Sequence, residues 1–392
     1  MTAGPALVRR ALSAPLDYVL LCPAYPSHGR SGGEFIRTRV EAYCNAGLRG
    51  AVVEYATGTQ DATVEADEMV TVIRLPAPSL PDVVEVVGRR QYPVLAHSPT
   101  PEAQDLLRDK VAGERLTFWF HGYEVRDHRR LYGNYSSREA PRYGLLLRPP
   151  QPAMEAAART FRDPRVTKVF VSGFQMRASE FDVGAEVDNG VVIPNHIDGE
   201  SFRYRNRGAA DARSILLMRS FRARNYGNDI ALRAIEHLSA RAGFSDLQFT
   251  IRGFGALFEA ETAGLFRYEN VDIVQRYSTP VEMAAAHYSH GVFLCPSRYD
   301  TQGVMLGEAM ASGMVCVTNR VAAIPEFTDE TCSLLVKPDD PLSFAEAIWA
   351  LVENPHVLAG FSRRAAARVR SQCGYDATIA RELELIRNGS VL

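Results

Sequence analysis

The stretch from Val292 to Glu326 constrains the fold of this chain more than any other part of the sequence. An apolar run at 292–295 predicts a buried parallel strand, and a polar loop follows it. The helical pattern that begins at Gly303 ends at Gly313, a residue typical of the position just past a helix. A second apolar run, 315–317, predicts the next strand. This βαβ order places the loop at the carboxyl end of a strand, where ligands bind in open α/β sheets.

Two carboxylates flank this loop and helix. Asp300 lies at the mouth of the loop, and Glu308 lies on the first turns of the helix. A helix N-terminus favours anions, because its free N–H groups and dipole are positive. Carboxylates accept hydrogen bonds from hydroxyl groups. The pattern therefore favours a sugar that carries a phosphate. The alternative is structural: Asp300 caps the helix, and Glu308 is an exposed helix carboxylate.

The same stretch resembles the signature of the retaining glycosyltransferases of family 4, which are group 1 glycosyltransferases with the GT-B fold. The matching residues are Pro296 and Ser297, an acid at position 300, the run EAMASG at 308–313 and the run IPE at 324–326. The departure is Asp300, because the family usually has Glu there. The resemblance implies an α/β fold of the GT-B class, in which two Rossmann-like domains face each other across a cleft.

The resemblance covers nearly the whole chain and implies its domain organisation. The run IPNHID at 193–198 resembles the hinge phrase IPNGID of the family, with His196 in place of Gly. We expect an N-terminal Rossmann-like acceptor-binding domain at 1–195 and a C-terminal Rossmann-like domain for the nucleotide sugar at 196–374. The final helix, within 375–392, is expected to pack back on the first domain.

The first domain has its own candidate residues. A strand at 18–22 is followed by a loop with Gly32 and Gly33, which resembles the family loop that lies against the donor diphosphate and the acceptor. Glycine loops alone are weak signals, and the alternative is a tight turn. His121 follows an apolar run at 116–120 and resembles the active-site histidine that contacts the transferred sugar. A lone histidine is more often structural.

The second domain opens with a strand at 214–218. In the family, an Arg and a Lys in the next loop clamp the donor diphosphate. The Lys is absent here, and Arg219, Arg222 and Arg224 are the candidate replacements. A guanidinium group suits phosphate because it offers paired N–H donors. For any one of these arginines, the alternative is an exposed surface residue.

The resemblance assigns roles to the remaining donor-site residues. His121, Asp300 and Arg219 form the expected catalytic set, and Glu308 is expected to bind ribose hydroxyls. Gly253 approaches the nucleotide, and Gln275 and Arg276 face the base. Asp300 and the backbone of the following residues hold the donor sugar and phosphates: Thr301, Gln302, Gly303, Val304 and Met305.

Composition excludes several classes of protein. The 392 residues are 46% hydrophobic and 23% charged, as in a globular chain, and a net charge of −2 gives no reason to expect nucleic acid. There is no apolar run long enough to predict a transmembrane segment, although peripheral membrane contact stays open. Scattered cysteines indicate reduced thiols and a cytoplasmic location. The preference for Arg over Lys resembles the bias of a GC-rich genome, which suggests a bacterial protein. No sequence pattern indicates a metal site or a cofactor beyond the nucleotide-sugar co-substrate.

The expected function is therefore that of a retaining, metal-independent glycosyltransferase of the hexosyltransferase type. It would move a sugar from a nucleoside-diphosphate sugar to an unidentified hydroxyl of a small molecule, a glycan or a lipid-linked acceptor. Two alternatives stay open. A sugar-nucleotide epimerase would share the GT-B architecture but use no acceptor. A non-catalytic partner subunit would keep the fold and lose turnover, and the Asp300 and missing-Lys departures favour it.

Overall fold

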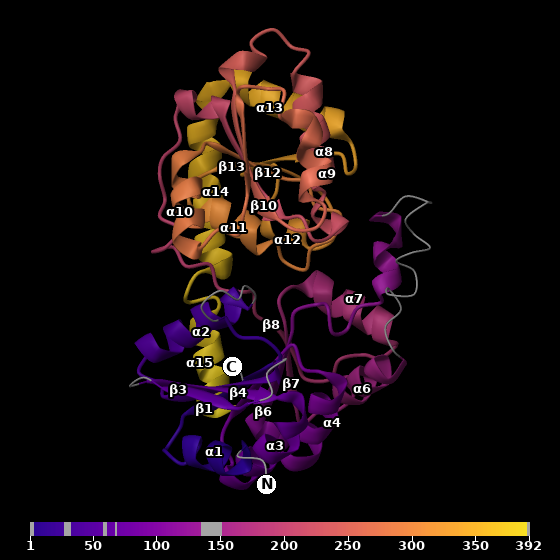
Figure 1. The fold of residues 1–392 in the computed structure, drawn as a ribbon, viewed down its shortest axis with the longest axis vertical. Coiled ribbons are helices and arrows are strands. Elements are labelled where there is room, and N and C mark those ends of the chain that lie inside the picture. Colours follow the sequence, from indigo (N-terminus) through magenta and orange to yellow (C-terminus); the bar gives the residue numbers. More distant parts are fainter. Residues whose placement is uncertain (1–3, 27–32, 58–60, 67–68, 135–150, 390–392) are drawn as a thin grey trace. The chain divides into compact units, whose positions relative to one another are not determined.

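The structure, a computed structural model, describes residues 4–26, 33–57, 61–66, 69–134 and 151–389. It divides into two compact units, each with its own sheet (Figure 1). The first unit consists of Met1–Arg129, Gly144–His196 and Asp376–Leu392, and the second consists of Arg130–Tyr143 and Ile197–Tyr375. In the described ranges, no helix has both the length and the apolar composition that a membrane crossing requires.

The sheet of the first unit has the strand order β3-β4-β2-β1-β5-β6-β7-β8. The described neighbours pair in parallel, except that β3 and β4 are antiparallel. Its chain order reverses between β1 and β5, which creates a topological switch point. The strands are β1 Tyr18–Cys22, β2 Gly50–Thr57, β3 Thr63–Ala66, β4 Val70–Pro76, β5 Val94–His97, β6 Leu116–Phe120, β7 Thr167–Phe170 and β8 Gly190–Val192.

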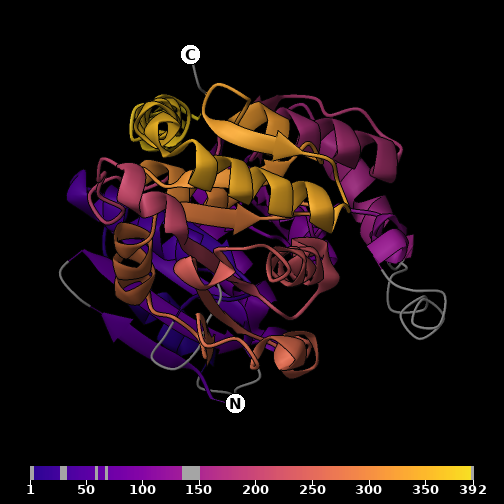
Figure 2. The same ribbon diagram turned by 90° about the horizontal axis from the view of Figure 1, so that it is seen from above.

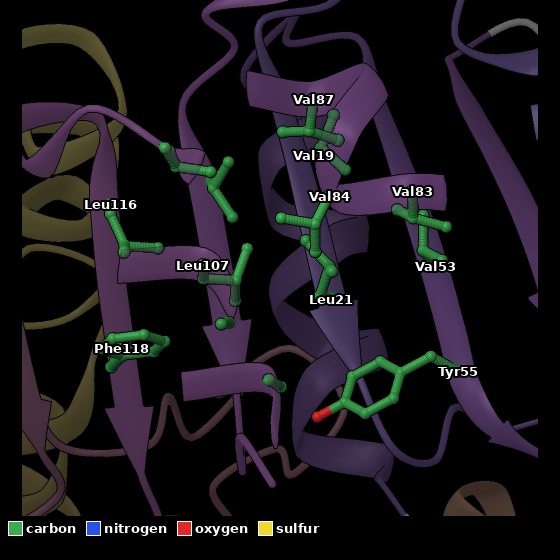
Figure 3. Close-up of a cluster of buried hydrophobic side chains, with 14 of the residues drawn as sticks. Val19, Leu21, Val53, Tyr55, Val83, Val84, Val87, Leu107, Leu116 and Phe118 are labelled. Carbon is green, nitrogen blue, oxygen red and sulfur yellow. The ribbon is translucent and has the colours of Figure 1, made fainter. Parts of the chain in front are cut away.

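Helices cover both faces of the first sheet. Along β1, Val19 and Leu21 face one hydrophobic core, and Leu20 faces the other, because successive side chains alternate between faces. Figure 3 shows Val19 and Leu21 beside Val84 and Val87 of helix α3. Helices α1, α3, α4 and α6 contribute to this first core, whereas α2 and α15 contribute to the second. The helices are α1 Gly4–Ala11, α2 Glu34–Asn45, α3 Leu80–Arg90, α4 Pro101–Lys110, α6 Gln151–Phe161, α7 Gly173–Val183 and α15 Ile379–Asn388.

A buried ion pair joins α15, near the end of the chain, to α2, near its beginning. Arg39 Nε donates to Glu382 Oε1 over 2.9 Å, and both side chains are fully buried. The Tyr43 hydroxyl donates to the other oxygen of Glu382. Arg39 also donates to the side-chain oxygen of Asn195 over 3.0 Å. The charges are thus compensated by hydrogen bonds, which a buried pair requires.

The sheet of the second unit has the order β11-β10-β9-β12-β13-β14, with parallel pairs throughout its described strands. Its chain order reverses at β9, which lies between β10 and β12. The carboxyl ends of β9 and β12 therefore flank the topological switch point of this sheet. The strands are β9 Ser214–Ser220, β10 Gln248–Phe254, β11 Val271–Gln275, β12 Val292–Cys295, β13 Val315–Asn319 and β14 Ser333–Val336.

Helices also lie on both faces of the second sheet (Figures 1 and 2). Helices α8 and α13 pack together on one face, and α11 packs with α14 on the other. The helices are α8 Asn228–Leu238, α9 Phe258–Thr262, α10 Pro280–Ser289, α11 Val304–Ala311, α12 Ile324–Phe327, α13 Pro341–Glu353 and α14 Leu358–Cys373. Two α/β units, one with a parallel sheet and one with a sheet that is parallel except for β3, confirm the predicted α/β class.

Arg207 is a fully buried cation that caps two of these helices. Its guanidinium donates to the carbonyls of His287 and Tyr288 at the end of α10, over 2.8 and 2.7 Å. It also donates to the carbonyl of Ser312, just past α11, over 2.9 Å. Burial lowers the pKa of Arg207 to about 10. The group remains charged at neutral pH, and its charge complements the negative ends of both helices.

Candidate functional site

The loops that follow β9 and β12 pack backbone to backbone at the switch point of the second sheet. The N–H groups of Arg298 and Tyr299 donate to the carbonyl of Asn225 over 2.8 and 3.2 Å. Gly227 has φ 66°, and a Cβ atom at this position would lie 1.6 Å from the carbonyl oxygen of Pro296. Only glycine satisfies both conditions. Gly227, in the loop after β9, thus allows the loop after β12 to lie directly against it.

Arg219, at the carboxyl end of β9, has an exposed fraction of only 4%. Its guanidinium donates to Cys295 Sγ and, over 3.2 Å, to Ser297 Oγ. Its carbon lies 5.0 Å from the centre of the Tyr226 ring. Burial opposes the charged form, but Cys295 and Asp300 outweigh it and raise the pKa of Arg219. The predicted clamp residue is therefore a permanent cation held in one orientation.

Asp300 connects this cation to the start of α11. Its Oδ2 atom lies 3.4 Å from Arg219 Nη2. Its Oδ1 atom accepts from the backbone N–H groups of Gly303, over 2.8 Å, and Gln302, over 3.2 Å. Gly303 is the N-cap residue of α11 and has φ 83°. One oxygen of Asp300 thus holds the N-cap residue of α11 and the residue before it, rather than the N–H groups of the helix itself, and the other oxygen forms an ion pair.

Glu308 lies on α11 and is half-buried rather than exposed. Its Oε2 atom is buried and has no hydrogen-bond partner among the described residues. Burial alone raises the pKa of Glu308 to about 8. The interpretation of Glu308 as an exposed helix carboxylate is therefore wrong. A buried polar atom without a partner is unfavourable, and a ligand hydroxyl would satisfy it.

The other predicted residues of this loop and helix have different surroundings. Gln302 is buried, and its amide group contacts Cys373 Sγ over 3.7 Å. Such a side chain positions the loop rather than meeting solvent. The side chains of Thr301, Val304 and Met305 are half-buried, and Val304 is the first residue of α11. Their roles in donor binding stay predictions.

The two remaining candidate arginines differ from Arg219 in exposure. Arg222 is exposed, and its guanidinium carbon lies 5.7 Å from the centre of the Phe254 ring. Arg224 is half-buried within the short 3-10 turn Arg224–Tyr226, and its carbonyl accepts from Arg298 Nη1 over 3.1 Å. The choice between Arg222 and Arg224 as the second clamp residue stays a prediction.

The predicted nucleotide-facing residues lie at the ends of β10 and β11. A Cβ atom on Gly253 would lie 2.4 Å from the carbonyl oxygen of Arg219 and 2.5 Å from the Phe221 ring. Gly253 is therefore required for the close approach of β10 to β9. Gln275 and Arg276 are exposed at the end of β11, and Arg276 forms a 2.6 Å ion pair with Glu282. Their contact with a base stays a prediction.

In the first unit, the structure brings a second histidine to His121. Gly33 is the N-cap residue of α2, with φ 78°, while Gly32 lies outside the described residues. His121 follows β6, and its Nε2 atom lies 3.1 Å from Nδ1 of His97, the last residue of β5. Sequence analysis did not identify His97. The sequence signal for His97 is that it directly follows a short apolar run, 94–96, as His121 follows the apolar run 116–120.

Comparisons with known proteins show what the chain is similar to. The family Glycosyl transferases group 1 matches residues 212–354. The D-inositol 3-phosphate glycosyltransferase of Pseudarthrobacter chlorophenolicus is 24% identical over 387 residues, which cover 92% of this chain and 91% of that protein. These similarities support a group 1 glycosyltransferase. The matched segment contains Arg219, Asp300 and Glu308.

Solved structures show the same fold as this chain. Sucrose-phosphate synthase from Thermosynechococcus elongatus has a TM-score of 0.72 at 19% identity, with coverage of 94% of this chain and 98% of that one. Anabaena HepE in complex with UDP and glucose has a TM-score of 0.65 at 14% identity, with coverage of 94% and 99%. These similarities confirm that the chain has the GT-B fold.

Independence of metal ions stays a prediction for this chain. In the part of the chain that the structure describes, no three His, Cys, Asp or Glu side chains are grouped as metal ligands. The cation that the geometry does provide near the α11 N-terminus is Arg219. Turnover measured with and without EDTA tests whether the protein needs a divalent ion.

Proposed function

We propose that this protein is a retaining glycosyltransferase that moves a hexose from a nucleoside-diphosphate sugar to an acceptor hydroxyl. The observation that carries the proposal is the combination of three groups on one unit. The Arg219 cation and the N-terminus of α11 both favour phosphate. Glu308, on the same helix, has a buried oxygen without a partner among the described residues, which suits a ribose hydroxyl.

The proposed reaction follows from these groups and from the family resemblance. The acceptor oxygen forms a bond to the anomeric carbon, and the bond from that carbon to the diphosphate oxygen breaks. The acceptor proton passes to the departing diphosphate oxygen, and the anomeric configuration is retained. Arg219, with Arg222 or Arg224, stabilises the charge that develops on the diphosphate. Asp300 is assigned to the donor sugar side, and His121 to the transferred sugar.

The acceptor is proposed to bind mainly to the first unit. The name of the Pseudarthrobacter relative makes a phosphorylated polyol, such as D-inositol 3-phosphate, the first acceptor to test. Glycans and lipid-linked acceptors are tested beside it. We also propose a cytoplasmic location, which is supported by the six cysteines that are all free in the structure.

The experiment is a donor panel with and without acceptor. The protein is incubated with UDP-glucose, UDP-N-acetylglucosamine and GDP-mannose, and the release of nucleoside diphosphate is measured. Release that increases with inositol 3-phosphate, or with another acceptor of the panel, supports the proposal, and NMR of the product's anomeric proton tests retention. Isomerised sugar nucleotide without diphosphate would instead indicate an epimerase. No turnover and no nucleotide binding would indicate a partner subunit.

Two variants make the panel interpretable. Glu308→Ala should lose most of the turnover, because it removes the proposed ribose acceptor. Glu384→Ala, an exposed glutamate on α15, should keep it. Equal activity of both variants would contradict the role assigned to Glu308 even if the protein is a transferase.

A further inference from the structure

Arg39 lies where helix α15 meets helix α2, and it contacts three parts of the first unit (Figure 1). Its Nε atom donates to Glu382 Oε1 of α15 over 2.9 Å. Its Nη1 atom donates over 3.0 Å both to the side-chain oxygen of Asn195 and to the carbonyl of Phe35, on the first turn of α2. One guanidinium group thus links α15, Asn195 and the start of α2.

The first turn of α2 lies against the candidate site of the first unit. Phe35 is half-buried, and its ring centre lies 4.4 Å from that of His121, with an angle of 48° between the rings. Gly33, the N-cap residue of α2, has φ 78°, and its carbonyl accepts from the N–H groups of Ile36 and Arg37. The direction of this turn decides where the Phe35 ring lies, and therefore what covers one side of the His121 ring.

Arg39 also acts on the site through its charge. Burial lowers the pKa values of His97 and His121 well below the usual range, and the Arg39 guanidinium contributes to both shifts. A cation has this effect because it disfavours a second positive charge nearby. The charge of Arg39 therefore reaches the same imidazole that its contacts with α2 help to place.

The buried pair of Arg39 and Glu382 is not explained by stability alone. Both side chains are fully buried, and taking two charges out of water can cost more than their attraction returns. Arg39 Nη2 is also buried and has no hydrogen-bond partner among the described residues, which is unfavourable for a donor. Replacing such a pair by uncharged side chains of similar volume is often neutral or stabilising. A role in the site gives a reason for the pair.

We propose that Arg39 is a positioning residue: held by Glu382 of α15, it fixes the first turn of α2 so that Phe35 packs against the His121 ring. Helix α15, which follows the second unit in the sequence, thereby contributes to a site on the first unit. That the His121 ring meets a transferred sugar rests on the proposed function. The placement of the turn is a property of the free protein and needs no donor.

NMR of the full chain, with the histidine side chains labelled with ¹³C, tests the placement directly. The His121 signals are those absent from His121→Asn. Because an aromatic ring shifts the signals of the atoms beside it, Phe35→Leu shows where the His121 signals lie without the Phe35 ring. The double variant Arg39→Met with Glu382→Gln removes both charges and keeps an oxygen that can accept from Tyr43. In this variant, we expect the His121 signals to move from their wild-type positions toward those of Phe35→Leu.

Turnover is the second readout. With the donor that turns over in the panel, the double variant should lower kcat about tenfold, because a small displacement of a group that contacts substrate is costly in rate. KM for the donor should change little, since the nucleotide is proposed to bind to the second unit.

Thermal melting shows whether the double variant folds. If it does not, Arg39→Lys carries the same two measurements with the same expected directions. Its ammonium group keeps a charge opposite Glu382 but lacks the planar fork that also reaches Phe35 and Asn195.

A second buried ion pair of the first unit supplies the control. Arg74 Nε lies 3.1 Å from Glu54 Oε2, and the exposed fractions of the two side chains are 9% and 1%. Arg74→Met with Glu54→Gln removes the same two charges at another place in the unit. It should change neither the His121 signals nor kcat.

His121 signals that stay at their wild-type positions in the folded variant would overturn the proposal, and so would signals that move while kcat is unchanged. If the wild type turns over no donor, the proposed function fails, while the NMR result still decides whether Arg39 places the turn. If neither the signals nor kcat change in the variant, the role of Arg39 fails and the proposed function stands.

Discussion

Arg219 Nη2 lies 3.4 Å from one carboxylate oxygen of Asp300, and the other oxygen of Asp300 accepts from the N–H of Gly303 over 2.8 Å. One acid thus connects a buried cation to the N-cap residue of a helix. Both oxygens of Asp300 are engaged within the protein, whereas an oxygen of Glu308 has no partner among the described residues. This difference predicts unequal roles in nucleotide binding.

Glu308→Ala should weaken nucleotide binding more than Asp300→Ala does. Loss of a carboxylate that accepts from ribose hydroxyls should cost about 1.5 to 3 kcal/mol, or roughly 10- to 100-fold in Kd. Asp300→Ala should cost less, because Asp300 acts mainly through Arg219 and α11. Calorimetry with UDP and GDP measures both variants, with Glu384→Ala as the control. The reverse order would contradict the roles assigned here.

Nucleotide affinity should rise with pH up to about 8. The pKa of Glu308 is raised to about 8 by burial, so the carboxyl group is mostly protonated in the free protein at pH 7. Hydrogen bonds from ribose stabilise the carboxylate and lower this pKa, so binding releases a proton and is favoured by higher pH. Above about pH 8 the effect should level off. The nucleotide phosphates also titrate, so the binding free energy of Glu308→Gln is measured at each pH and subtracted from that of the wild type. A difference that does not change with pH would contradict the prediction.

Gly227→Ala should be far more damaging than Gly184→Ala. Both glycines have positive φ, 66° and 71°, so each substitution has a backbone cost of about 1 kcal/mol. At Gly184 no described atom lies within 4 Å of the added Cβ, but at Gly227 the Cβ would lie 1.6 Å from the Pro296 carbonyl oxygen. Gly227→Ala should separate the two loops, lower the melting temperature markedly and abolish UDP binding. Similar melting temperatures for both variants would disprove the close loop contact.

Arg207→Met should destabilise the second unit by on the order of 3 kcal/mol, because it leaves several buried carbonyls at the ends of α10 and α11 without donors. Arg207→Lys should recover only part of this, since an ammonium group cannot reach all of them. The free energy of unfolding in urea is the measurement. Arg203→Met, at an exposed arginine, is the control and should cost less than about 0.5 kcal/mol.

Transferase activity should survive EDTA. The proposed stabilisation of the departing diphosphate relies on Arg219 and the N-terminus of α11 rather than on a divalent cation. Turnover is measured after dialysis against EDTA and again after addition of Mg²⁺, with no more than about a twofold difference expected between them. Activity that disappears with EDTA and returns with Mg²⁺ would contradict this prediction.

The sequence predicts the fold best where strands are fully buried. The strand at 292–295 and the helix between Gly303 and Gly313 form as expected. A continuous apolar run is typical of a buried parallel strand, and both glycines adopt the positive φ that is common at helix ends. The short antiparallel strand β3 was not predicted, since all four of its residues are exposed and its pattern is not apolar. Strand β5 has only four residues, which is too short for an alternating pattern of apolar residues to be recognised.

The site is less predictable than the fold, because its decisive relations are between residues distant in sequence. The motif identifies Arg219, Asp300 and Glu308 as candidates, but not that Asp300 is bound to Arg219 while Glu308 lacks a described partner. His97 becomes visible only through the register of β5 with β6. Contacts of this kind depend on strand order, which local sequence patterns do not contain.

The ion pair between Arg39 and Glu382 also bears on how the protein is made. During synthesis, Arg39 emerges long before Glu382, and both segments of the second unit are translated between them. The main segment, Ile197–Tyr375, is continuous and can fold while the ribosome is still at work, whereas the second core of the first unit must wait for α15. Until translation reaches Glu382, α2 lacks the partner that neutralises its buried cation. The N-terminal half is therefore the last part of the nascent chain to mature.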